Sequence, residues 1–178
     1  MFGLCCHVLG GFFGGLVRPE LLHRQHRRSG DNHAGRNGHE VAPERVDGEE
    51  DEHAAVWGAM FNAGQTCVSV ERVYVLDAVY QQFVDAVVRA VEDLKMGAGD
   101  GHDFGAQIDD SQVAVTERHV ADALAKGARA LTGGKRGTGA GSFYEPTVLV
   151  DVDHSMLCMT EETFGPTLPI MKVGSVQE

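Results

Sequence analysis

The sequence is poor in cysteine, with four in 178 residues, and their spacing follows no recognisable pattern. Small secreted domains that depend on disulfides carry a denser set of cysteines, and zinc sites group them in short pairs. Cys5 and Cys6 are adjacent, whereas Cys67 and Cys158 are each isolated. The cysteine content therefore favours a reducing compartment, and we predict a cytoplasmic location.

Long apolar runs are missing as well. A membrane-spanning helix needs about 20 consecutive apolar residues, and the uncharged stretch over residues 1–17 is shorter and is interrupted by glycines. A signal peptide starts with basic residues and ends at a cleavage site of small residues, and residues 17–20 offer no such site. We expect neither a membrane span nor a signal peptide.

Positive charge is scarce relative to negative charge. The chain has 15 Lys and Arg against 26 Asp and Glu, a formal net charge of -11. An acidic surface repels phosphate backbones and anionic lipid headgroups. We therefore expect no nucleic acid and no membrane as partners.

Apolar periodicity is weak between residues 18 and 52, where arginine, histidine and acidic residues predominate. Such a segment buries little apolar surface. Residues 1–52 are thus left unassigned, as an irregular N-terminal third that is disordered or not native to the fold, and a domain is predicted over residues 53–178. No metal site is expected, because no two histidines of residues 18–52 are four positions apart and no cysteine lies among them. These histidines are His23, His26, His33 and His39.

Downstream of residue 53, helical and strand patterns alternate. Alternation of this kind is typical of an α/β fold, here an open sheet with flanking helices. We predict helices over residues 53–64, 77–97 and 111–127, and strands over residues 70–76, 128–132, 144–150 and 168–173. On the second helix we predict one apolar stripe, made of Val79, Phe83, Val84, Val87, Val88, Val91 and Leu94, and Asp77 can cap this helix. On the last of the helices the predicted buried residues are Val113, Val120, Ala121 and Leu124.

The string FNAGQTC covers the end of the first predicted helix and the turn after it, so that Cys67 falls just beyond the helix. Attack on a carbonyl carbon needs a thiolate, and a turn with nearby backbone N–H groups favours that form. The same N–H groups can stabilise an oxyanion. By itself a single intracellular cysteine is more commonly a small buried apolar residue, which is the interpretation we give Cys158.

The string EETFGP, residues 161–166, precedes the last predicted strand. A carboxylate at such a turn accepts hydrogen bonds from ribose hydroxyls, although an acidic exposed turn is also common without any ligand. Glu71 and Arg72 invite two further interpretations, an ion pair or contact with a substrate carboxylate; a surface ion pair is the usual outcome.

Together the two strings resemble the signatures of the NAD(P)-dependent aldehyde dehydrogenase family, with Asn62, Gly64, Gln65 and Cys67 matching position by position. The resemblance implies that Cys67 is the nucleophile. It also implies that Glu162 holds the nicotinamide ribose and that Phe164 packs near the nicotinamide ring. The implied reaction oxidises a small-molecule aldehyde to a carboxylic acid with NAD or NADP, through a thiohemiacetal and a thioester on the cysteine.

The sequence also departs from the family pattern. It has no Glu-Leu-Gly-Gly-Lys string for the general base, no dinucleotide-binding half, and no oligomerisation strand, although family members are homo-oligomers. We therefore expect a partial aldehyde-dehydrogenase-like catalytic domain that is inactive as an isolated chain. The alternatives are a non-catalytic remnant or interaction fragment of a broken gene, and an esterase that uses the thiol alone.

Overall fold

The computed structural model describes residues 39–40 and 51–175. Most of the unassigned segment 1–52 lies outside these described residues, including the side chains of His23, His26, His33 and His39. The described elements, in chain order, are β1 (His39–Glu40), α2 (Asp51–Met60), η1 (Phe61–Gly64), β2 (Val73–Leu76), α3 (Asp77–Glu92), α4 (Asp110–Ala125), β3 (Arg129–Ala130), β4 (Thr147–Val150), α5 (Leu157–Thr160) and β5 (Thr167–Val173).

These strands form one sheet in the order β1-β2-β5-β4-β3. The neighbours β1 and β2, β2 and β5, and β4 and β5 are parallel, and only β3 runs antiparallel to its neighbour β4. Strand β5 pairs on one side with β2, through Val73 and Ile170, and on the other with β4, through Val148 and Leu168. The last strand of the described chain therefore lies in the centre of the sheet.

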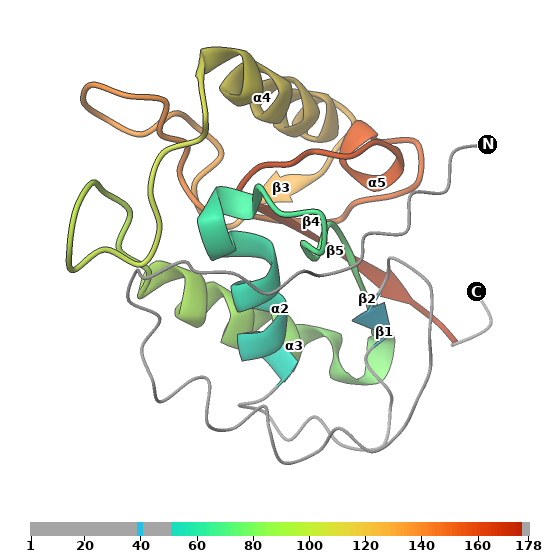
Figure 1. The fold of residues 1–178 in the computed structure, drawn as a ribbon. Helices are drawn as coiled ribbons and strands as arrows, with labels where there is room; N and C mark the ends of the chain where they lie inside the picture. The colour runs from blue at the N-terminus through green and yellow to red at the C-terminus, as the bar shows by residue number, and fades with distance from the viewer. Residues whose placement is uncertain (1–38, 41–50, 176–178) are drawn as a thin grey trace. The chain divides into compact units, whose positions relative to one another are not determined.

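Helices cover both faces of the sheet (Figure 1). Successive strand residues point to opposite faces. Val73, Val75 and Ile170 consequently join one core cluster with α2 and α3. Tyr74 and Leu149 join a second cluster with α4 and α5. The predicted α/β fold, an open sheet with flanking helices, is confirmed.

Helix α3 has the predicted apolar stripe. Phe83, Val84, Val87 and Val91 are buried against the sheet, at the spacing of one helix face. Asp77 does not cap the helix from outside, because it is itself the first helical residue. Its carboxylate lies 3.3 Å from the ammonium of Lys172 on β5 instead.

Two predictions about buried positions and strand length are wrong. Ala121 and Leu124 of α4 are exposed, and polar residues take their place on the buried face. The strand predicted over residues 70–76 starts only at Val73. Val70 donates its N–H to the Gly58 carbonyl of α2, so the preceding residues are drawn away from the sheet toward the helix.

None of the helices in the described part of the chain is both long and apolar enough to cross a membrane.

Candidate functional site

Cys67 lies in an exposed turn between η1 and β2. The Ser69 N–H closes the turn by donating to the Thr66 carbonyl at 3.0 Å. Before it, the backbone takes three successive left-handed steps, with φ of 53° at Asn62, 56° at Ala63 and 73° at Gly64. Left-handed backbone in non-glycine residues is uncommon and concentrates at functional sites. Here it ends helix α2 abruptly and turns the chain so that the thiol faces outward.

Asn62 and Gln65 hold this loop in shape. The Asn62 side chain donates to the Gln65 carbonyl at 3.1 Å, and the Gln65 side chain donates to the Asn62 carbonyl at 3.0 Å. The Gln65 side-chain oxygen in turn accepts the Ile108 N–H at 2.8 Å. The two polar residues of the motif therefore brace the turn and tie it to the loop before α4.

The second motif forms a turn between α5 and β5. Glu162 is exposed, Thr163 is buried, and Phe164 is half-buried. Phe164 is again a non-glycine residue in the left-handed region, with φ of 51°. A bulky side chain in this region requires outside support.

Glu71 and Arg72 supply part of that support. The Glu71 carboxylate accepts the N–H groups of Thr163 and Phe164, at 3.0 and 3.1 Å. The Arg72 guanidinium donates to the Glu161 carbonyl at 3.1 Å. The prediction of a surface ion pair between these two side chains is wrong, since both bind backbone groups of the turn.

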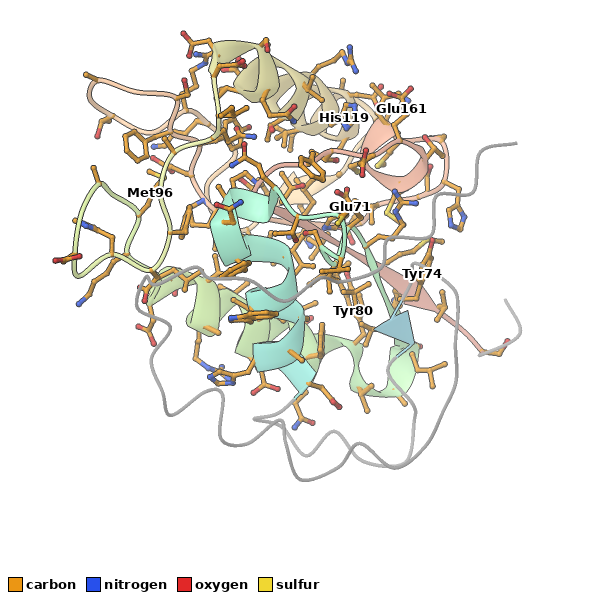
Figure 2. All side chains as sticks on the ribbon, in the orientation of Figure 1. Glu71, Tyr74, Tyr80, Met96, His119 and Glu161 are labelled. Atoms are coloured by element: carbon orange, nitrogen blue, oxygen red, sulfur yellow. The ribbon has the colours of Figure 1, made fainter. Side chains whose placement is uncertain are left out.

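Helix α4 and the loop before it support the turn from the other side. Gln112 donates to the carbonyls of Thr163 and Phe164, at 2.8 and 3.0 Å. The buried His119 hydrogen-bonds the Thr163 hydroxyl at 3.0 Å. In Figure 2, Glu71 lies below and His119 above the stretch that follows Glu161.

Sequence reasoning missed these helix residues, although a signal was present. Gln112, Thr116 and His119 recur at helical spacing on the same side of α4 as Val113 and Val120. Polar groups on a buried helix face need partners, so such a row indicates a polar structure packed against the helix.

Acidification is expected to destabilise the fold through His119. Burial, together with the nearby Arg118 charge, lowers the pKa of this imidazole below its usual 6.5. The unfolded chain therefore takes up the proton more readily, and the stabilisation is present above pH 6.5 and lost as pH falls below it. Urea unfolding at pH 7.5 and at pH 5.5 measures this effect. The free energy of unfolding should fall less between these two pH values for His119→Gln than for the unmutated chain. An equal loss in both would contradict it.

The two loops meet at a pair of glycines. A Cβ atom on Gly64 would overlap the carbonyl of Gly165, which follows Phe164 directly. Strands β2 and β5, which begin just after the two loops, are also hydrogen-bonded neighbours. The fold thus brings the Cys67 turn and the Glu162–Phe164 turn to the same end of the sheet, where the parallel strands β2 and β5 begin.

Cys158 has a different environment. It is 1% exposed, and burial raises the pKa of its thiol to about 11. The prediction that Cys158 is a core residue is confirmed.

Comparison with known proteins agrees with the two motifs. Residues 33–178 match the model of the aldehyde dehydrogenase family. The chain is 43% identical over 143 residues to the 3-sulfolactaldehyde dehydrogenase of Pseudomonas putida, covering 77% of this chain and 29% of that protein. It is 44% identical over 137 residues to the NADP(+)-dependent succinate-semialdehyde dehydrogenase GabD of Escherichia coli, covering 74% and 28%.

Solved structures give the same result. Succinate-semialdehyde dehydrogenase from Burkholderia pseudomallei superposes with a TM-score of 0.74 at 39% identity, covering 78% of this chain and 29% of that one. Betaine aldehyde dehydrogenase from Staphylococcus aureus, in complex with NAD+, superposes with a TM-score of 0.68 at 31% identity, covering 71% and 26%. The chain spans less than a third of the length of these relatives. With the family model matched over residues 33–178, this chain belongs to the aldehyde dehydrogenase family.

Proposed function

We propose that this chain carries the nucleophile and the cofactor-facing turn of an NAD(P)-dependent aldehyde dehydrogenase. The observation that supports this most is the meeting of the two loops: the exposed Cys67 and the exposed Glu162 come from turns that are packed together at Gly64 and Gly165. A nucleophile and a cofactor-binding carboxylate have to face one small cleft for oxidation of a bound aldehyde.

In the proposed reaction the Cys67 sulfur adds to the carbonyl carbon, which forms a C–S bond and places negative charge on the oxygen. Within the described residues, the N–H groups of Cys67 and Val68 have no hydrogen-bond partner. They are therefore free to donate to that oxygen. Once the carbon is oxidised, Cys67 holds the acyl group as a thioester, and water releases the carboxylic acid and regenerates the thiol.

The cofactor turn fits the ribose and nicotinamide end of a dinucleotide. The exposed Glu162 carboxylate has acceptor oxygens for ribose hydroxyls, and Phe164 adds an aromatic surface beside it. An acidic group is poorly suited to a phosphate, so we assign the turn to the ribose rather than to the pyrophosphate. When bound, NAD or NADP supplies the hydride acceptor of the oxidation.

For the substrate we propose a small aldehyde that carries an acidic group. The names of the relatives support this class, since one acts on 3-sulfolactaldehyde and another on succinate semialdehyde. We also propose a cytoplasmic location for this protein.

A hybrid enzyme tests the proposal. Residues 53–175 of this chain replace the aligned segment of GabD, and reduction of NADP is followed with succinate semialdehyde as substrate. Aldehyde-dependent reduction by the hybrid supports the assignment. A folded hybrid of normal oligomeric state that binds NADP but reduces none contradicts it, and cleavage of p-nitrophenyl acetate without oxidation would indicate an esterase.

A further inference from the structure

The turn over residues 161–164 is held almost entirely by side chains from elsewhere. Phe164 has a left-handed φ of 51°, a conformation that costs a non-glycine residue about 1 kcal/mol or more. Among the described residues, its one backbone–backbone hydrogen bond is that of the Glu161 N–H, which donates to the Leu157 carbonyl of α5 at 2.8 Å. Its shape therefore depends on the groups that bind its peptide units.

The contacts come from two sides. Gln112 donates to the Thr163 and Phe164 carbonyls from α4. Glu71 accepts the N–H groups of the same two residues from the segment before β2. Thr163 and Phe164 are thus each hydrogen-bonded through both the N–H and the carbonyl.

Glu71 combines two features as a support of the turn. It brings an acidic group to two N–H donors at 3.0 and 3.1 Å, and hydrogen bonds to a carboxylate are stronger than those between neutral groups. It also lies four residues after Cys67 on the same segment. A single short stretch of chain therefore carries the proposed nucleophile at one end and the anchor of the cofactor turn at the other.

We propose that Glu71 is a positioning residue of the cofactor site: its carboxylate fixes the Thr163 and Phe164 peptide units and so sets how Glu162 and Phe164 are presented beside Cys67. The role of the turn in cofactor binding rests on the proposed function. Glu71 itself touches no reacting atom. It acts by keeping the site in its binding shape before the ligand arrives, which lowers the ordering cost of binding.

Amide exchange in the full chain tests the holding step. Glu71→Gln keeps the size of the side chain but replaces one acceptor oxygen by an NH2 group, so one N–H loses its partner. Exchange of the Thr163 and Phe164 amides, followed by NMR, should accelerate at least about tenfold. Glu117→Gln is the matched control. Glu117 lies on α4 and binds Arg136 of the loop between β3 and β4, so its substitution should leave both amides unchanged.

Cofactor affinity tests the positioning step. Fluorescence titration with NADPH gives a Kd for the GabD hybrid that carries the unmutated segment and for the hybrids that carry Glu71→Gln, Glu162→Gln and the double substitution. We expect each single substitution to weaken binding by about fivefold or more, and the double variant to lose less affinity than the two single losses combined, since Glu71 acts in part through Glu162. The Glu117→Gln control should bind as the unmutated hybrid does.

The outcomes separate the two proposals. Unchanged amide exchange in Glu71→Gln overturns the role of Glu71. So does an unchanged Kd in Glu71→Gln when Glu162→Gln weakens binding, or a double variant whose losses simply add. Binding that is absent from every variant contradicts the cofactor assignment of the turn instead, and amide exchange alone then decides whether Glu71 holds it.

Discussion

Replacing Cys67 by alanine is expected to remove the fastest-reacting site of acylation of the full chain by p-nitrophenyl acetate. In the hybrid enzyme it should lower aldehyde oxidation by at least about a thousandfold, as loss of a nucleophile does in other covalent mechanisms. Cys158→Ala should change both rates by less than about threefold, because a small change in the core has little effect on the reactivity of the exposed Cys67 thiol. The pair is matched, since each substitution removes one thiol.

The contrast follows from the surroundings of the two sulfurs. Cys67 is exposed on its turn, whereas Cys158 is 1% exposed. Since the thiolate is the attacking form, a pKa of about 11 leaves roughly one Cys158 in a thousand ionised at pH 8. Burial then hinders the reagent as well. Any acyl transfer at neutral pH must therefore come from a thiol other than Cys158.

Peptide mass spectrometry after brief exposure to the ester assigns the acetyl group to individual cysteines and so includes Cys5 and Cys6. Raising the pH from 8 to 10 should increase labelling of Cys158 about a hundredfold in the folded chain, because its thiolate fraction grows tenfold per pH unit below its pKa. Labelling of Cys158 that equals that of Cys67 at pH 8 would contradict the assignment.

Sequence reasoning located the elements that depend on local periodicity. The apolar stripe of α3 repeats at helical spacing over four turns, and its residues Phe83, Val87 and Val91 are buried as expected. Strand β5 is marked by a continuous apolar run, which is typical of a strand covered on both faces. Local pattern and final environment agree in these elements, so the sequence is sufficient to predict them.

Long-range polar contacts were not predictable in the same way. Glu71 bonds with residues more than 90 positions later in the chain, and nothing around Glu71 distinguishes it from an exposed acid at the start of a strand. Leu124 was predicted to be buried by hydropathy alone, yet α4 turns His119 and Thr116 inward, where His119 bonds the Thr163 hydroxyl and Thr116 bonds the Gln107 side chain. The partners of a polar group are fixed only when the fold is known.

The close approach of the two loops makes Gly64 the most sensitive position of the site. Gly64→Ala is expected to lower the free energy of unfolding by about 3 kcal/mol or more, from two sources. A Cβ at φ of 73° is strained, and it would overlap the backbone of Gly165, which cannot move without displacing the turn before it. Thr116 lies directly behind Gly165 and blocks retreat on that side.

Gly99→Ala separates these two sources. Gly99 has a φ of 84°, and a Cβ built there meets no atom within 4 Å. Its substitution should therefore cost only the backbone strain, about 1 kcal/mol. Urea unfolding of both variants measures the difference, and the acylation rate of Cys67 reports the local consequence, which should fall for Gly64→Ala and not for Gly99→Ala. Equal losses in the two variants would mean that the loops are free to separate, and a nucleophile and a cofactor turn that separate freely would not form one site.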